Sequence, residues 1–225
     1  MTEANVFERI LVPLDGSRFG EHALPRALSL ASRWGAALEL VMVATPQGGG
    51  QPQPGVVGDE ARERGQALAE SYLEDVEKRL ADAGFDGEIR RTVVSPGNVA
   101  NSLVRHLIEV EADFAVMTTH GRGPIQRAWL GSTADAFIRS SPVPVLLLRP
   151  TAGEAKDEGG DGEGEPASSA AIGPVPPPFS RILIPLDGSR SAERLLKVSR
   201  PLAGDDALTL LLRAVPAFTS GGSPY

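Results

Sequence analysis

Two glycine-containing segments carry residue types and spacings that suit an anion site. The first is Asp15-Gly-Ser17, and the second runs over residues 117–123 and is followed by Gly131-Ser-Thr133. Glycine lets backbone N–H groups approach an anion because no Cβ stands in the way. The second segment leads into a predicted helix, whose first N–H groups are unpaired and carry a partial positive charge. These segments therefore predict a phosphate-binding site.

Other kinds of reactive site have little support. The chain has no cysteine, which removes thiolate nucleophiles, disulfides and cysteine-ligated metals. Its three histidines are scattered without metal-ligand spacing, and we expect His22 and His106 on helix surfaces. His120 is predicted to orient a loop or to neighbour a ligand, because no partner for general base catalysis accompanies it. Trp34 and Trp129 are interpreted as packing residues, and no catalytic residue is predicted.

Strand and helix patterns alternate around the two segments. Apolar runs rich in branched residues predict strands at residues 9–14, 37–44, 88–94, 113–119 and 143–149. Helical patterns with their caps occupy residues 17–34, 59–83, 98–111 and 131–140. The alternation predicts an α/β fold, an open five-stranded parallel sheet with helices on both faces. Ligands bind such sheets beyond the carboxyl ends of the strands, where both segments fall.

Individual residues mark the ends and faces of these helices. Ser17 is a predicted N-cap, Gly35 ends the same helix, and Pro25 bends that helix or lies in its first turns. The long helix at residues 59–83 has large side chains at helical spacing. We expect four of them to face the sheet: Leu68, Tyr72, Val76 and Leu80.

The most informative feature is an internal repeat. Residues 10–18 recur as residues 182–190, and eight of the nine are identical, with Val12 against Ile184 as the exception. The recurrence predicts that a second α/β unit begins at Phe179. This second repeat reaches a further strand near residues 207–215. We expect it to lack the phosphate loop and to be too small to fold independently.

The segment between the repeats differs in composition from both. Residues 151–178 are rich in Gly, Glu, Ala, Ser and Pro and are predicted to form a flexible acidic linker with an extended proline end. We therefore expect a complete domain at residues 1–150, this linker, and a truncated second repeat at residues 179–225. Residues 153–165 hold six acids and one lysine, a net −5 of the total −7.

The remaining charge and the hydropathy limit the classes of partner that we expect. No basic stripe for nucleic acid is visible. The N-terminus lacks the basic and apolar regions of a signal peptide, and no stretch approaches 18 apolar residues. We expect a cytoplasmic protein that binds neither nucleic acid nor membrane.

A longer motif joins the second segment. Gly121 is followed by nine residues and then by Gly131 and Ser132, the opening is Ile-Leu-Val-Pro-Leu-Asp-Gly-Ser at residues 10–17, and Pro-Val-Pro-Val-Leu-Leu-Leu-Arg closes residues 142–149. These features resemble the ATP-binding universal stress proteins, which carry G-x-x-G, nine residues and then G-[S/T]. The resemblance covers residues 7–150 fully and residues 179–218 in part. It implies a Rossmann-like fold of the adenine nucleotide alpha hydrolase type, in tandem with an incomplete second repeat.

The resemblance also implies a ligand, ATP, with Mg²⁺ as a candidate companion. The nucleoside would be contacted by Pro13, Leu14 and Asp15, by Val43 at the adenine, and by Met117 and Thr118 beneath it. The phosphates would be held by Gly121, Gly131, Ser132 and Thr133. Asp15 would also contact Mg²⁺, which proteins commonly hold through few carboxylates together with phosphate oxygens. Thr118 departs from the family, because it stands where the motif has its first glycine.

These features favour a stress-response regulatory protein that binds ATP and acts by binding or dimerisation rather than turnover. A weak ATPase stays open, although no Walker lysine or water-positioning base accompanies the phosphate site. Because Thr118 replaces the motif glycine, a family member that dimerises without binding nucleotide is a further alternative. A dinucleotide oxidoreductase fits poorly, because Asp-Gly-Ser follows the first strand in place of G-x-G-x-x-G. We expect a homodimer, formed through the apolar edge of the strand at residues 143–149.

Overall fold

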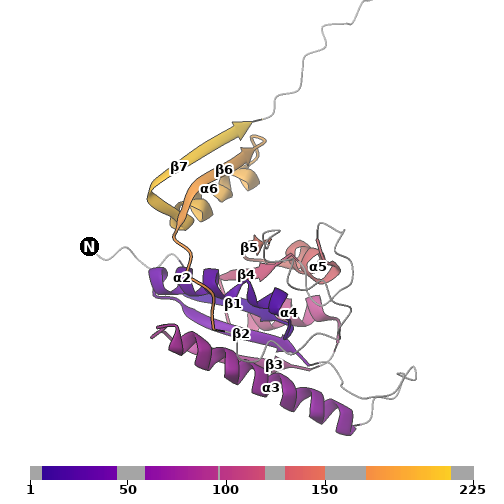
Figure 1. Cartoon of the computed structure of the whole chain (residues 1–225). Helices are drawn as coiled ribbons and strands as arrows, with labels where there is room; N and C mark the ends of the chain where they lie inside the picture. The colour runs from indigo at the N-terminus through magenta and orange to yellow at the C-terminus, as the bar shows by residue number, and fades with distance from the viewer. Residues whose placement is uncertain (1–6, 45–58, 96, 120–129, 150–170, 214–225) are drawn as a thin grey trace, which may run out of the picture. The chain divides into compact units, whose positions relative to one another are not determined.

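The chain divides into two compact units, Met1–Pro176 and Pro177–Tyr225 (Figure 1). The computed structural model describes residues 7–44, 59–95, 97–119, 130–149 and 171–213. Each unit is described by itself below.

The first unit contains one five-stranded sheet. Its strands are β1 (Arg9–Leu14), β2 (Ala37–Val43), β3 (Ile89–Val94), β4 (Phe114–Thr118) and β5 (Val145–Leu148). All neighbours pair in parallel, in the order β3-β2-β1-β4-β5, so Ile10 lies beside both Leu38 and Phe114. The predicted open parallel sheet is confirmed. The strand order changes direction between β1 and β4, and ligand crevices of such sheets lie at that point.

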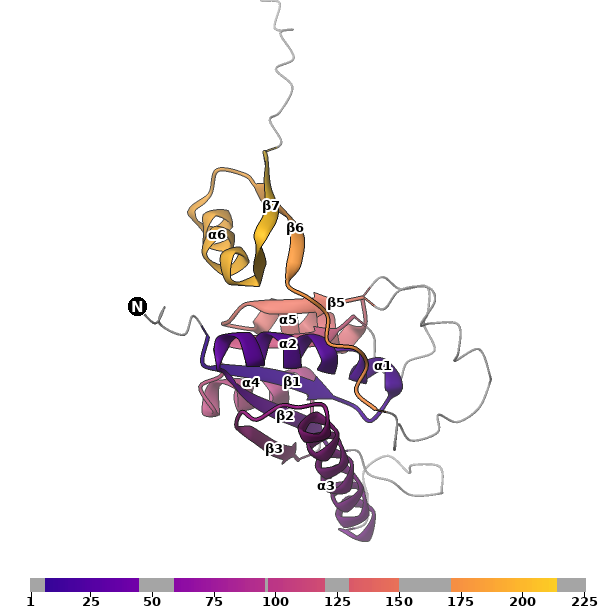
Figure 2. The same cartoon turned by 60° about the vertical axis from the view of Figure 1, so that its left-hand side comes forward.

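Helices cover both faces of this sheet (Figures 1 and 2). They are α1 (Arg18–Glu21), α2 (Leu24–Trp34), α3 (Asp59–Asp82), α4 (Val99–Glu109) and α5 (Ser132–Ser140). On one face, Leu11, Val41 and Met117 pack with Leu103 of α4 and Phe137 of α5. The other face carries Ile10, Val12, Leu38 and Leu40, all at most 1% exposed, against α2 and α3.

The single helix predicted at residues 17–34 is two helices, α1 and α2. Ser17 caps α1 as predicted, and Gly35 ends α2 with a φ of 63°. Pro25 lies in the first turn of α2. In one continuous helix its ring would clash with the carbonyl of Glu21, four residues earlier, and this accounts for the break.

The buried face of α3 also differs from the prediction. Leu68 is 53% exposed, whereas Ala69 is 1% exposed and Leu73 is 1% exposed. Val76 and Leu80 are buried as expected. Leu68 was expected to face the sheet because it is large and apolar, but the helix packs through the smaller Ala69.

An aromatic cluster lies behind β1 and β4. The ring of Trp34 is 4.8 Å from that of Phe7 and 5.2 Å from that of Phe114, centroid to centroid. Trp34 is 7% exposed, so its predicted packing role is confirmed. Trp129 lies outside the described residues.

The second unit is a strand, a helix and a strand: β6 (Phe179–Leu186), α6 (Arg190–Leu202) and β7 (Ala203–Arg213). β6 and β7 pair in parallel, as β1 and β2 do in the first unit. Ile184 is the one buried residue within residues 177–213. No helix among the described residues is long and apolar enough to cross a membrane.

Candidate functional site

The turn after β1 is tightly hydrogen-bonded. Asp15 Oδ1 accepts from the Ser17 amide at 3.0 Å and from Ser17 Oγ at 2.6 Å. Ser17 Oγ in turn accepts from the amide of Gly20 at 3.0 Å, and Gly16 has a φ of 76°. One oxygen of the Asp15 carboxylate is therefore committed to shaping the turn.

Gly20 is a part of this turn that the sequence did not single out. A Cβ built on Gly20 would lie 2.6 Å from Asp15 Oδ1, closer than real contacts allow. The second repeat has Asp187 and Ser189 in the same roles, with Asp187 Oδ1 accepting from the Ser189 amide at 2.8 Å, but it has Ala192 in place of the glycine. The amide of Ala192 donates to Ser189 Oγ at 3.1 Å, as the amide of Gly20 does to Ser17 Oγ.

The end of β4 is tied to its neighbours by backbone hydrogen bonds. The Thr119 amide donates to the Leu148 carbonyl at 2.9 Å, and the Thr119 carbonyl accepts from the Gly131 amide at 2.7 Å. Met117 and Thr118 are each 6% exposed. These bonds fix the start of α5 directly beyond the carboxyl end of β4.

The N-terminus of α5 lacks the side-chain cap found on α1 and α4. Ser17 caps α1 and Asn98 caps α4, where Asn98 Oδ1 accepts from the Asn101 amide at 3.1 Å. Gly131 occupies the same position on α5 and has no side chain with which to cap it. Among the described residues, no N-cap side chain therefore offsets the partial positive charge at the amides of Ser132 and Thr133.

The structure brings most predicted residues to one edge of the sheet. Pro13, Leu14 and Asp15 lie at the carboxyl end of β1, Val43 ends β2, and Met117 and Thr118 end β4. Gly131, Ser132 and Thr133 reach the same edge through the Thr119 carbonyl. Gly121 and His120 lie outside the described residues. The edge therefore combines apolar strand ends with a helix N-terminus.

An ion pair joins α1 to α3 next to this edge. Arg79 of α3 donates from Nη1 to Glu21 Oε2 at 2.9 Å and from Nη2 to Glu21 Oε1 at 2.7 Å. Tyr72 also donates to Glu21 Oε1 at 2.9 Å. Burial, together with the carboxylates of Glu21 and Asp15, raises the pKa of Tyr72 well above its usual value. The tyrosine therefore stays a neutral donor, and the group holds α1 against α3.

A second buried polar group lies beneath the sheet. His106 is 5% exposed, so its predicted place on a helix surface is wrong. Glu39 Oε1 lies 2.8 Å from His106 Nε2 and accepts from Thr92 Oγ1 at 2.8 Å. Burial opposes the charged form of Glu39, but hydrogen bonds from His106 and Thr92 and the charges of His106 and Arg9 outweigh burial and lower its pKa. Glu39 pairs with Leu11 in mid-strand, away from the carboxyl edge, so this group is structural.

A groove of about 710 Å³ lies between α3 and β3. Its lining residues include Glu70, Glu74 and Glu77 on one wall and Arg90 and Arg91 on the other. Arg91 Nε pairs with Glu77 Oε2 at 2.5 Å. None of the predicted nucleotide-site residues lines this groove. Among the described residues, no cluster of three or more His, Asp or Glu could hold a metal ion.

The fold is an open parallel α/β sheet, in which ligands bind at the carboxyl edge of the strands. Residues 7–149 match the Universal stress protein family. The chain therefore belongs to the universal stress protein family.

Individual relatives can be compared with the chain directly. A relative that carries the universal stress protein name in Staphylococcus aureus strain USA300 is 28% identical over 144 residues, covering 64% of this chain and 84% of the relative. The structure of universal stress protein UspA from Lactobacillus plantarum is 22% identical, with a TM-score of 0.55, and covers 64% of this chain and 98% of that one. A universal stress protein in complex with cAMP is 25% identical, with a TM-score of 0.48, and covers 64% and 98%.

Proposed function

We propose that the chain binds ATP at the carboxyl edge of the first unit's sheet and acts in a stress response through binding or dimerisation. The observation that carries the proposal is the uncapped N-terminus of α5, which stands at the Gly131-Ser132 position of the family motif. A helix N-terminus of this kind stabilises a phosphate group. The strand ends beside it supply the apolar surface that an adenosine requires.

We assign the nucleoside contacts to the ends of the three central strands. Pro13, Leu14 and Asp15 would lie along it, with Val43 at the adenine and Met117 and Thr118 beneath. Thr118 stands where the family motif has its first glycine, and it is buried.

We assign the phosphates to the amides of Ser132 and Thr133, together with Gly121. The Gly131 amide already donates to Thr119, so Gly131 would contribute by the absence of a capping side chain. Asp15 would also contact Mg²⁺ alongside the phosphates, because proteins commonly hold this ion through few carboxylates together with phosphate oxygens.

Binding without turnover fits the chemistry of this edge better than catalysis does. Asp15 is held within its own turn, and no lysine of the Walker type follows β1. A weak ATPase and a nucleotide-independent dimer are the alternatives. We also propose that residues 1–150 are the functional domain, that residues 151–178 link it to the second repeat at 179–225, and that the protein is cytoplasmic and homodimeric through β5.

Calorimetry on the full chain with ATP, AMP and adenosine tests the phosphate assignment. We expect affinity to fall in that order. Ser132→Ala should weaken ATP binding only modestly, by about 0.5–1.5 kcal/mol if its hydroxyl makes one hydrogen bond. Ser140→Ala, at the far end of the same helix, is the matched control. Equal affinity for ATP and adenosine would contradict the proposal.

Gly131→Asp gives a sharper test. Gly131 has φ −69° and ψ 149°, which any residue can adopt, and aspartate is a preferred N-cap. Its carboxylate should cap the first-turn amides and repel phosphate. We expect an unchanged or higher Tm together with loss of ATP binding, whereas retained binding would show that the α5 N-terminus does not hold phosphate.

A further inference from the structure

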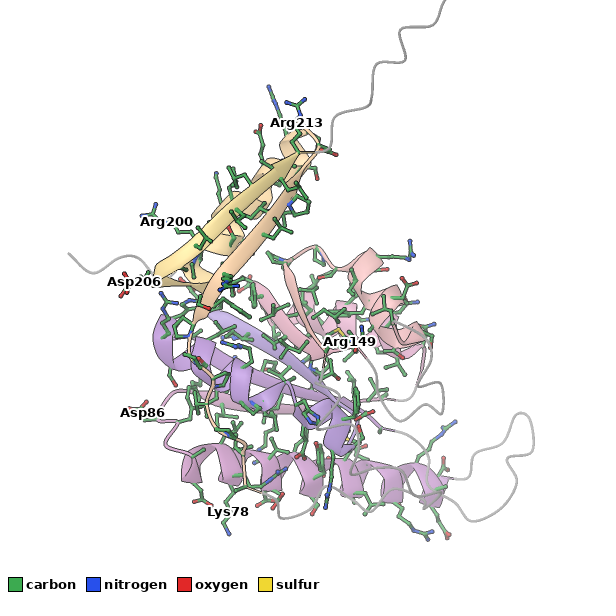
Figure 3. All side chains as sticks on the ribbon, turned by 45° about the horizontal axis from the view of Figure 1, so that its top comes forward. Lys78, Asp86, Arg149, Arg200, Asp206 and Arg213 are labelled. Carbon is green, nitrogen blue, oxygen red and sulfur yellow. The ribbon has the colours of Figure 1, made fainter. Side chains whose placement is uncertain are left out.

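Arg149 is a charged residue at the carboxyl edge of the first unit's sheet that the assigned site does not use. It directly follows β5 and is exposed (Figure 3). The Thr119 amide donates to the Leu148 carbonyl at 2.9 Å, so the β4–β5 ladder continues beyond its last pair, Thr118 with Leu148. In a parallel ladder this bond places Arg149 opposite Thr119. The arginine therefore lies in register with the residue that leads from β4 toward α5.

Strand alternation places the Arg149 side chain on the face of the sheet that carries α5. Val145 and Leu147 pack against the core cluster that contains Phe137 of α5. Side chains two residues apart on a strand lie on the same face, so Arg149 shares the face of Val145 and Leu147. Since α5 starts directly beyond the carboxyl end of β4, Arg149 lies on the face and at the edge where this helix begins.

Two backbone hydrogen bonds connect this position to the first turn of α5. One joins the Leu148 carbonyl to the Thr119 amide, and the other joins the Thr119 carbonyl to the Gly131 amide at 2.7 Å. A single residue of the β4 chain, Thr119, therefore separates the end of β5 from the N-cap of α5. Arginine carries its guanidinium on a flexible stem of methylene groups, which is long enough to extend past one residue. A group bound at the first amides of α5 is thus within reach of Arg149.

The charges around this position favour an anion. The first turn of α5 carries the partial positive charge of a helix N-terminus, and its N-cap, Gly131, has no side chain. Asp135 in the same turn is already paired, because Arg139 Nε donates to both of its carboxylate oxygens at 3.0 Å. Among the described residues, no hydrogen bond or ion pair engages the Arg149 guanidinium. A full and a partial positive charge therefore lie near each other, and an anion bound between them is stabilised by both.

We propose that Arg149 binds the terminal phosphates of the nucleotide and makes the site selective for ATP over AMP. The inference rests on the proposed function and names the residue that distinguishes nucleotides by the number of their phosphates. The amides of Ser132 and Thr133 hold one phosphate, and the planar guanidinium binds two oxygens of the next. Arg149 thereby supplies from the end of β5 the full positive charge that a lysine supplies in Walker-type sites.

Calorimetry on the full chain with ATP and AMP tests this role through Arg149→Gln, which removes the charge and keeps a polar side chain. The affinity for ATP should fall about 10-fold or more, as expected for the loss of a hydrogen bond from a charged group. The affinity for AMP should stay unchanged, because AMP has no phosphate beyond the one that α5 holds. Arg149→Lys keeps the charge but not the planar fork, so it should retain part of the affinity for ATP.

Arg33→Gln is the matched control. Arg33 is exposed in the last turn of α2, shortly before β2 begins, so it lies at the opposite edge of the sheet. This substitution changes the net charge by the same amount and should leave both affinities unchanged. A loss of ATP affinity equal to that of Arg149→Gln would show a general effect of charge and would overturn the proposal.

Two further results would overturn it. ATP binding by Arg149→Gln as tight as that of the unmodified chain would show that the arginine does not contact phosphate. An equal loss of affinity for ATP and AMP would show that Arg149 supports the site as a whole rather than binding the terminal phosphates. Failure of the proposed function is distinguishable from both, since the unmodified chain would then bind ATP no more tightly than adenosine, and the role of Arg149 would fall with it.

Discussion

At the scale of single residues, the turn after β1 depends on Gly20, which has no side chain. Asp15 Oδ1 binds both the amide and the hydroxyl of Ser17, while the hydroxyl binds the amide of Gly20. The absence of a Cβ at Gly20 lets the first turn of α1 approach the carboxylate. The orientation of Asp15 at the proposed nucleotide edge therefore depends on Gly20.

Gly20→Ala should displace the Asp15 carboxylate, because the new Cβ would lie 2.6 Å from Oδ1. We expect a loss of about 1–3 kcal/mol in the free energy of unfolding, as for other overpacked sites, and weaker ATP binding. Urea unfolding and calorimetry measure the two effects. Gly97→Ala is the control, since its Cβ would meet Ser102 Oγ at an ordinary 3.4 Å. Equal stabilities of the two variants would contradict this account.

At the scale of elements, buried polar groups join helices to the sheet. Glu39 of β2 bonds Thr92 of β3 and His106 of α4. The Glu21–Arg79 pair performs the same task for α1 and α3. If either helix moved, a buried charge would lose its partner, which is strongly destabilising. Such pairs therefore help to hold each helix in position.

The lowered pKa of Glu39 predicts an acid-sensitive fold. A carboxyl group whose pKa is depressed on folding stabilises the protein above its ordinary value, here 4.5, and this stabilisation is lost as pH falls below it. The free energy of unfolding should therefore fall faster below pH 4.5 in the natural protein than in Glu39→Gln, by up to about 1.4 kcal/mol per pH unit for one proton. Urea titrations from about pH 6 down to about pH 3 measure this, with the exposed Glu60→Gln as control. Parallel curves for all three proteins would show that Glu39 is not the group responsible.

The free edge of β5 gives a prediction about the proposed homodimer. The carbonyls of Pro144 and Leu148 accept from β4, so in a parallel ladder the backbone of Val145 faces the open edge. Val145→Pro removes the N–H that a partner strand would use, while the bonds to β4 remain. Light scattering should show loss of dimer for Val145→Pro but not for Val145→Ala, which shortens the side chain and keeps the N–H. A dimer that persists in the proline variant would place the interface elsewhere.

At the scale of the whole molecule, local signals proved easier to read than distant ones. The strand at residues 9–14 and the caps Ser17 and Gly35 agree with the structure, because each depends on a few neighbouring residues. The burial of His106 was missed because its partner Glu39 lies 67 residues away. For the candidate site, the motif located the strand ends and the start of α5, but Gly20 and the Glu21–Arg79 pair were missed. Their importance depends on how α1 packs, and no spacing in the sequence encodes that packing.

The two units should also differ in stability. The first unit has a continuous core on both faces of its sheet, whereas α6 has no buried residue and Ile184 alone is buried within residues 177–213. Amide protection follows buried contacts, so hydrogen exchange should be much faster in β6, α6 and β7 than in β1 and β4. Hydrogen exchange followed by mass spectrometry tests this expectation. Protection in β7 equal to that in β1 at low concentration would mean that the second unit is stabilised by contacts other than those described.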